Sequence, residues 1–285
     1  MIVPKKPTKI VVTLHDVLPL EIPGFLTCER DIEAFKAKTQ RDLDNADLVF
    51  TASQHSREMI IKTFQLSREP ILAPYASTLS QSDISTGGVQ VEHAPESFFL
   101  YVGGYHSRKG IEQLVETHRE LFTSKRIHRK LILVGRVHHY SAEIARLIDS
   151  AMECGSLVQL GYVTDLQLVW LFRRARALVY PSLYEGFGLP VLEAMQVGCP
   201  VLTTKGTSLP EICDSAALIV DPSNKTEFGQ ALIELDRNDS LRSDLIAKGH
   251  RRASLYSWGR SAGLFLENVL GRPRILARSH EMDHR

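Results

Sequence analysis

The chain has 285 residues, enough for one large domain or two of medium size. Its 44% hydrophobic and 24% charged residues are typical of a globular protein with an ample core. The formal net charge of +1 provides no overall field that would favour nucleic acid as a partner. No apolar run approaches the roughly 18 residues of a membrane span, and the N-terminus lacks the apolar core of a signal peptide.

The cysteines and histidines give no sign of a metal site or a disulfide framework. The four cysteines, which form no CxxC pair, are Cys28, Cys154, Cys199 and Cys213. Scattered cysteines of this kind predict reduced thiols in a cytosolic protein. The histidines show no metal-ligand spacing with carboxylates or cysteines, so we expect no metal.

The first part of the chain predicts three short strands joined by two helices. The strand candidates are Ile10–Leu14, Ala46–Ser53 and Ile71–Pro74. The helical stretches are Arg30–Leu43 and Gln54–Phe64. Ser53 is placed to cap the second helix. Three parallel strands make a thin sheet with an exposed edge, so we interpret residues 1–76 as a partial Rossmann-like domain.

A linker and a more regular α/β region follow. Residues 77–97 are rich in Ser, Thr, Gln, Gly and acids, a composition typical of a linker. The next strand candidates are Phe98–Val102, Leu131–Val134, Leu157–Leu160, Ala177–Tyr180, Pro200–Thr203 and Ala217–Val220. Helical stretches lie between most of them, which predicts a doubly wound parallel sheet within residues 98–257. We expect a final helix at residues 258–271 and a flexible tail at residues 272–285.

The stretch Tyr180–Pro200 contains the strongest functional signal. A strand end is followed by a glycine-rich loop, and Pro190 then opens a helix that ends at Gly198. Glycines let the loop backbone approach a ligand, and the helix N-terminus favours an anion, most often phosphate. Glu185 and Glu193 flank this turn. Acids beside a phosphate cradle suggest a sugar joined to a phosphate, with the acids binding hydroxyls.

The segment from Glu185 to Glu193 (EGFGLPVLE) resembles the E-x7-E signature of the family 4 glycosyltransferases, which are retaining, group 1 enzymes with a GT-B fold. Tyr101–Gly110 resembles the strand and basic loop that hold the donor diphosphate. Thr13–Asp16 (TLHD) resembles a segment late in the family's N-terminal domain. The resemblance covers roughly Val11 to Leu270. It implies an α/β, GT-B-like fold with a complete C-terminal nucleotide-sugar domain at residues 98–257.

Two departures from the family pattern bear on this expectation. Members usually have about ninety further residues, with a strand and a Gly-rich loop, before the His-Asp segment. We therefore expect residues 1–76 to be a truncated acceptor-side domain, to which the helix at residues 258–271 crosses back. In addition, Gly104 stands where many members have arginine, which leaves Arg108 and Lys109 as the cations of the diphosphate loop.

The resemblance also implies roles for single residues. Arg108 and Lys109 would stabilise the charge that builds on the departing β-phosphate. Glu185 would bind a donor-sugar hydroxyl, Glu193 the ribose hydroxyls, and His15 the donor sugar or the acceptor. The expected catalytic residues are Glu185, Lys109, Arg108 and His15. The expected donor-binding residues are Gly103, Gly104, Gly135, Val163, Gly186, Phe187, Gly188, Leu189 and Glu193.

Structural interpretations of the same residues remain open. The Arg108-Lys109 pair also fits a solvated basic turn, although its place beside the acidic loop favours function. Glu185 fits a surface carboxylate at a helix start, and the loop at Val163 fits simple packing. A single histidine such as His15 is often structural. We expect Glu211, near a short helix start, to be a cap or dipole partner.

The functional hypothesis is a metal-independent hexosyltransferase of polysaccharide biosynthesis in the cytoplasm. Its donor would be a GDP- or UDP-hexose, with GDP-mannose first, and no other cofactor is expected. Its acceptor would be a glycan or a lipid-linked sugar. The basic run at residues 120–130 fits either peripheral contact with the inner membrane face or a solvated helix end. The alternatives are a nucleotide-sugar-binding remnant that needs a complementing chain, and a GT-B epimerase.

Overall fold

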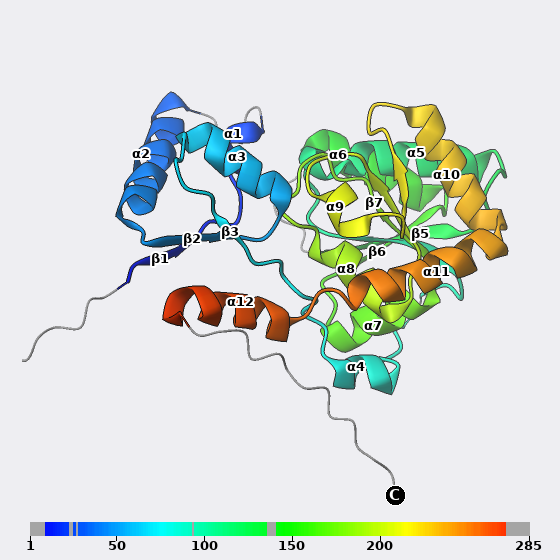
Figure 1. The fold of residues 1–285 in the computed structure, drawn as a ribbon. Helices are drawn as coiled ribbons and strands as arrows, with labels where there is room; N and C mark the ends of the chain where they lie inside the picture. Colours follow the sequence, from blue (N-terminus) through cyan, green and yellow to red (C-terminus); the bar gives the residue numbers. More distant parts are fainter. Residues whose placement is uncertain (1–8, 23–24, 27, 93, 136–140, 272–285) are drawn as a thin grey trace, which may run out of the picture.

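The computed structural model describes residues 9–22, 25–26, 28–92, 94–135 and 141–271 (Figure 1). The first eight residues of the expected first domain and the expected tail at residues 272–285 lie outside this set. Within it, the strands form two separate sheets, one of three strands and one of six. Every strand pair is parallel. Both sheets therefore depend on helical crossovers.

The chain folds as two parts of unequal length, which we call its halves. The first half, up to residue 76, builds the smaller sheet, in the order β1-β2-β3. Its elements are β1 (Val11–Thr13), α1 (Leu18–Glu21), α2 (Glu29–Asn45), β2 (Leu48–Thr51), α3 (Gln54–Phe64) and β3 (Ile71–Leu72). The Ser53 side chain accepts a hydrogen bond from the backbone N–H of Ser56, so the expected cap of α3 is confirmed. A small core of Val17, Leu43, Ile60 and neighbours holds the helices to the sheet.

The segment expected to be a linker contains a helix that its composition did not predict, α4 (Gln81–Thr86). Ser80 caps its start, and Gly87 ends it in the left-handed conformation. The segment also packs on the second half of the chain. The Val89 N–H donates to the Leu166 carbonyl at 3.0 Å, and Arg173 donates to the Ile84 carbonyl at 2.7 Å.

The second half, from residue 98 to residue 257, builds the larger sheet, in the order β6-β5-β4-β7-β8-β9. Its strands are β4 (Phe98–Val102), β5 (Lys130–Val134), β6 (Leu157–Gly161), β7 (Ala175–Tyr180), β8 (Val201–Thr204) and β9 (Leu218–Val220). Its helices are η1 (Ser107–Lys109), α5 (Ile111–Thr123), α6 (Ala142–Glu153), α7 (Asp165–Arg174), α8 (Leu189–Val197), α9 (Leu209–Cys213), α10 (Lys225–Arg237) and α11 (Asp239–Ala253). The strand order reverses between β4 and β7, and ligands of such sheets bind beyond the carboxyl ends at this point.

Helices cover both faces of the larger sheet. Phe98 and Leu100 of β4 point into one core with α7, α8 and α9, whereas Phe99 and Tyr101 point into another with α5, α6 and α10. Figure 1 shows these two helical layers on either side of the sheet. The alternation explains why β4 is a continuous apolar run, since both faces of a doubly wound sheet are buried.

The last helix, α12 (Trp258–Leu270), lies against the smaller sheet (Figure 1). The rings of Phe265 and Phe50 are 5.0 Å apart, and Lys9 donates to the Val269 carbonyl at 3.0 Å. The Trp258 indole N–H donates to the Ser77 carbonyl at 3.0 Å. Across the described ranges, no helix has the length and apolar character needed to span a bilayer.

Candidate functional site

Two loops meet where the strand order of the larger sheet reverses. One runs from Gly103 to Gly110 after β4, and the other from Pro181 to Gly188 after β7. The Leu183 N–H donates to the Arg108 carbonyl at 2.8 Å. Gly110 has a φ of 67°, and a Cβ there would collide with the Pro181 carbonyl oxygen. Glycine at this position therefore allows the two loops to pack directly on each other.

Lys109 and Glu185, one from each loop, form an ion pair. Their side chains are only 12% and 10% exposed. Tyr180 completes the cluster, because its hydroxyl donates to Glu185 Oε1 at 2.8 Å and lies 2.9 Å from Lys109 Nζ. Burial lowers the pKa of Lys109, and the Glu185 carboxylate opposes that shift. The pair places a cation and a carboxylate side by side beyond the carboxyl ends of β4 and β7.

A cleft of about 340 Å³ opens above this pair. The second half of the chain contributes Gly103, Arg108, Lys109, Tyr180, Glu185 and the five residues from Gly186 to Pro190. The first half contributes His15, Asp16, Leu18 and Tyr75. Arg108 is anchored by donating to the Tyr184 carbonyl at 3.2 Å. The cleft also borders the N-terminus of α8, so two cations and the positive end of a helix dipole lie beside the same space, an arrangement that suits an anion.

All four expected catalytic residues line this cleft, together with five of the nine expected donor-binding residues: Gly103, Gly186, Phe187, Gly188 and Leu189. Four expected donor-binding residues do not line it: Gly104, Gly135, Val163 and Glu193. The Gly104 carbonyl accepts from the Tyr101 hydroxyl at 2.7 Å. A Cβ on Gly135 would collide with the Gly103 carbonyl, so this glycine permits close approach of two strand ends. Val163 packs against the core beside α7.

Glu193 lies on α8 and faces the segment that joins the two halves. Its Oε1 accepts a hydrogen bond from the Thr78 hydroxyl at 2.5 Å. Burial raises the pKa of Glu193, whereas the Thr78 hydrogen bond acts against that shift. Glu193 is thus a second carboxylate on α8, and one of its oxygens is already hydrogen-bonded to Thr78.

The His15-Asp16 segment reaches the cleft from the carboxyl end of β1. His15 Nδ1 forms a hydrogen bond with the Tyr75 hydroxyl, and the Tyr75 ring lies 5.3 Å from that of Phe187. Asp16 Oδ1 accepts from the Leu18 N–H at 3.1 Å. Burial raises the pKa of Asp16, and burial with the Asp16 charge raises the pKa of Tyr75 to about 12.

Two further contacts bring the halves of the chain together. Glu211 of α9 accepts hydrogen bonds from the N–H groups of Gln54 and His55, at 2.8 and 3.0 Å. The Ser56 hydroxyl donates to the Gly186 carbonyl at 3.2 Å. Glu211 therefore caps a helix, as expected, but the helix is α3 of the other half.

The family described as glycosyl transferases, group 1, matches residues 89–252, more than half of the chain. The chain belongs to this family. It is 32% identical over 261 residues to the O-antigen chain mannosyltransferase B of Escherichia coli. The aligned region covers 90% of this chain and 68% of that protein. It is 26% identical over 288 residues to a serotype-specific mannosyltransferase WbdA of Escherichia coli, over 97% of this chain and 35% of WbdA.

The solved structures give the same fold. HepE of Anabaena, in complex with UDP and glucose, has a TM-score of 0.73 and 19% identity, covering 93% of this chain and 72% of that one. The α/β, GT-B-like fold and the assignment as a hexosyltransferase enzyme are therefore confirmed. The chain spans about a third of the length of WbdA. Membership of family 4, the retaining mechanism and the truncated first domain stay predictions.

The sequence pattern missed some residues that form this group 1 glycosyl transferase site. Tyr75 and Thr78 belong to the joining segment, where no periodicity or motif marks them. Asp16 follows His15 directly, and its position at a strand end was a usable signal. No group of three or more His, Cys, Asp or Glu in the described part of the chain could hold a metal ion.

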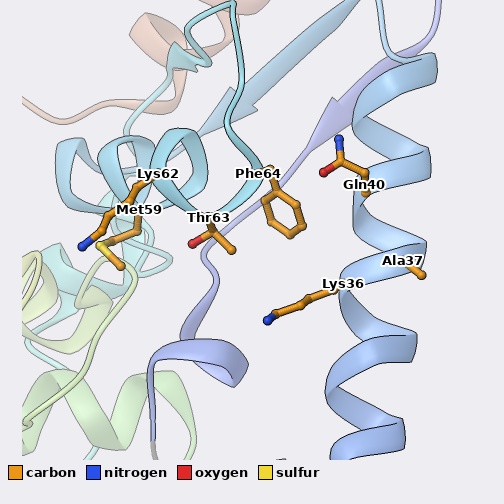
Figure 2. Close-up of a pocket in the computed structure, with 7 residues that line it drawn as sticks. All are labelled: Lys36, Ala37, Gln40, Met59, Lys62, Thr63 and Phe64. Carbon is orange, nitrogen blue, oxygen red and sulfur yellow. The ribbon is translucent and has the colours of Figure 1, made fainter.

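A second hollow lies between α2 and α3, away from the cleft (Figure 2). Its volume is about 530 Å³. Lys36 extends from α2 toward α3, and the side chains of Thr63 and Phe64, at the end of α3, lie on the side of that helix that faces α2 (Figure 2). No residue that lines this hollow also lines the cleft or was expected in the site. It is therefore separate from the group of residues around Lys109 and Glu185.

Proposed function

We propose that this group 1 glycosyl transferase is a retaining, metal-independent family 4 enzyme that transfers a hexose from a nucleotide-sugar to a glycan or lipid-linked acceptor. The observation that carries the proposal is the convergence of Arg108, Lys109 and Glu185 with the Gly186–Gly188 backbone in one cleft. GDP-mannose is the first donor to test, because two relatives are named mannosyltransferases. UDP-hexoses come next, because HepE was solved with UDP and glucose.

The proposed chemistry follows from the charges around the cleft. Breaking the bond between C1 of the hexose and the β-phosphate oxygen leaves the electron pair on that oxygen. Arg108, Lys109 and the dipole at the N-terminus of α8 stabilise this charge more than the charge of the bound donor. Lys109 is already held by Glu185, so its ammonium is positioned before the donor arrives. Preorganised cations of this kind need little rearrangement during the reaction.

Retention would follow from attack on the same face of the sugar. The acceptor hydroxyl oxygen forms a bond to C1 as the phosphate departs, and its proton passes to the departing phosphate oxygen. No carboxylate nucleophile is assigned in this scheme. Glu185 instead binds a donor hydroxyl through Oε2, because Oε1 is occupied by Lys109 and Tyr180. In this proposal Glu193 binds the ribose hydroxyls after releasing Thr78.

The remaining partners belong to the same proposal. The acceptor enters from the side of His15 and Tyr75, which the first half of the chain contributes. Beyond the nucleotide-sugar no cofactor takes part, and nucleic acid is not a partner. We place the enzyme in the cytoplasm, with peripheral contact at the inner membrane face through the basic run at residues 120–130. Within that run, Arg129 is engaged with Asp236 at 2.6 Å.

Calorimetry and an activity assay test the proposal. The chain is titrated with GDP-mannose, UDP-glucose, GDP and UDP in the presence of a metal chelator. Turnover is then measured with soluble glycan and lipid-linked acceptors, and the anomeric configuration of the product is read by NMR. Binding without metal and a product of retained configuration are expected. Failure to bind any of the four ligands, or an inverted product, contradicts the proposal.

A second candidate function is a donor-binding chain that transfers sugar only with a complementing polypeptide. The observation that favours it is the smaller sheet, in which β1 pairs with β2 and with no other strand in the described residues. The same assay separates the two candidates. Turnover by the monomeric chain contradicts the second, whereas binding without turnover supports it. An epimerase would convert the nucleotide-sugar in the absence of any acceptor.

A further inference from the structure

We infer that Asp16 binds a hydroxyl group of the donor hexose and thereby sets the specificity of the cleft for that sugar. The inference rests on the proposed function and adds a residue from the first half of the chain to the donor site. Asp16 lines the same cleft as Arg108, Lys109 and Glu185. It reaches the glycine-rich loop from the smaller sheet, because it follows β1, whereas Glu185 follows β7 of the larger sheet.

A backbone N–H of α1 anchors the Asp16 side chain. Its Oδ1 accepts a hydrogen bond from the Leu18 N–H at 3.1 Å, which ties the carboxylate to the start of α1. Its other oxygen, Oδ2, then lies directly against Gly186. A Cβ added to Gly186 would collide with Oδ2 and would stand 3.0 Å from Asp16 Cβ and Cγ. The absence of a side chain at Gly186 is therefore what allows Asp16 to reach the loop that holds the donor.

One oxygen of each cleft carboxylate is left to bind a ligand. Glu185 Oε1 accepts from Lys109 and Tyr180, and Asp16 Oδ1 accepts from Leu18. Glu185 Oε2 and Asp16 Oδ2 accept no hydrogen bond from the residues that the structure describes. An ionised carboxylate is an acceptor only, and a partly buried one is stabilised by donors. Sugar hydroxyls supply such donors, and water supplies them in the free enzyme.

The charges around Asp16 also suit a carboxylate that accepts from a neutral hydroxyl. Burial, with a smaller effect of Glu21, raises the pKa of Asp16, whereas the Leu18 N–H, His15 and Arg108 favour its charged form. A hydrogen bond donated by a hydroxyl would favour the charged form further. An anionic ligand group would instead be repelled, so the phosphates belong on the Arg108 and Lys109 side. This division places the hexose, rather than the diphosphate, beside Asp16.

The cleft has the volume of a small ligand site. At about 340 Å³ the cleft is at the lower end of the range for ligand cavities. A hexose held on the Gly186–Gly188 backbone would occupy the space between Glu185 and Asp16. The two carboxylates would then bind hydroxyls on different edges of the same ring. A hydroxyl bound by a charged partner contributes roughly 1.5–3 kcal/mol, or about 10- to 100-fold in selectivity.

The test uses Asp16→Asn, which preserves the shape of the side chain and an oxygen to accept from Leu18. The wild type and the variant are titrated by calorimetry with the nucleoside diphosphate alone, the parent nucleotide-hexose and its monodeoxy analogues. The wild type should lose about 10- to 100-fold in affinity for two deoxy analogues, one for each carboxylate. Asp16→Asn should bind the parent hexose and one of these two analogues equally, while its affinity for the nucleoside diphosphate stays unchanged.

Glu21→Gln is the matched control, since it makes the same carboxylate-to-amide change on α1 and Glu21 pairs with His55 at 3.4 Å. It should keep the discrimination of the wild type. Equal weakening of every ligand by Asp16→Asn, the nucleoside diphosphate included, overturns the inference and assigns Asp16 a structural role. Unchanged discrimination also overturns it. Failure of the wild type to bind any nucleotide-hexose instead overturns the proposed function, and the inference with it.

Discussion

The Glu211 carboxylate caps the N-terminus of α3 across the boundary between the two halves of the chain. Its two oxygens accept from the N–H groups of Gln54 and His55, so one side chain satisfies two of the orphan donors of the helix start. The adjacent Ser56 hydroxyl donates to the Gly186 carbonyl. The cap therefore holds α3 beside the loop that is proposed to bind the donor.

Replacing Glu211 with alanine should loosen this boundary. Loss of a helix cap costs about 0.5–2 kcal/mol, and the negative charge at the helix start is lost as well. Hydrogen exchange followed by mass spectrometry should show lost protection at the first turn of α3. Glu234→Ala, at an exposed position on α10, is the matched control. Unchanged protection at Gln54 and His55 would mean that Glu211 does not hold α3.

Replacing Lys109 with methionine should lower kcat by about 10²- to 10³-fold, the cost typical of losing one charge-stabilising donor. The Lys109–Glu185 pair makes the effects of the two positions interdependent. The double variant with Glu185→Gln should therefore be less impaired than the sum of the single variants predicts. Steady-state kinetics with the best donor measures this coupling. Lys225→Met removes an exposed lysine paired with Glu116 and Glu120 and should leave kcat unchanged.

Glu193 and Glu185 should differ in what their loss affects. Glu193→Ala removes the proposed ribose acceptor, so we expect weaker binding of the nucleoside diphosphate by about 10- to 100-fold. Glu185→Ala should reduce turnover more than nucleoside diphosphate binding. Calorimetry and kinetics on both variants give the comparison. If Glu193→Ala and Glu185→Ala lost the same affinity for the nucleoside diphosphate, the assigned roles would be contradicted.

Sequence reasoning located the elements with strong local signals. The helix α3 was predicted residue for residue, and α12 was predicted to within one residue. The reason is that Ser53 and Ser257 each accept from a backbone N–H in the first turn of their helix. The strand β4 was predicted equally well, because an apolar run buried on both faces leaves no ambiguity. The helices α1 and α4 were missed because four to six residues are too few to show a periodicity.

The part of the site formed by loops at strand ends could be predicted from the sequence. The part formed by the segment that joins the two halves, with Tyr75 and Thr78, could not. Parallel strands place their carboxyl ends at one edge, so the loops with Lys109 and Glu185 could be expected to meet. The Thr78–Glu193 hydrogen bond joins residues 115 positions apart and depends on how the segment at residues 77–97 packs. No local pattern encodes that packing. The closeness of Asp16 to Gly186 is likewise a result of how the two sheets are juxtaposed.

Replacing Gly186 with alanine should displace Asp16, because the new methyl group occupies the position of Oδ2. Neither residue can move freely, since Asp16 is bound to Leu18 and Gly186 to Ser56. We expect lower kcat/KM from Gly186→Ala and partial recovery in the double variant with Asp16→Ala, which removes the obstructing carboxylate. Gly259→Ala, where a Cβ meets nothing within 4 Å, is the control. Additive losses in the double variant would show that the two residues do not compete for space.

Folding stability should fall in mild acid because of His118. This residue is buried between α5 and the sheet, and its Nε2 lies 3.0 Å from the Arg129 carbonyl oxygen. Burial lowers its pKa to about 4, although the Arg129 carbonyl and Asp236 oppose the shift. In the unfolded chain a histidine has a pKa of about 6.5. Below that value the unfolded chain binds a proton that the folded chain does not bind, so stability is lost as the pH falls.

From about pH 7 to about pH 5 the loss attributable to His118 is about 2 kcal/mol, because each pKa unit corresponds to about 1.4 kcal/mol. Urea unfolding at both pH values measures it. His118→Gln removes the titration while keeping a polar side chain, so its stability should change less over this range than that of the wild type. His128→Gln, at an exposed position in the same region, should keep the wild-type slope. Identical slopes for all three proteins would mean that His118 can be protonated in the folded chain without penalty.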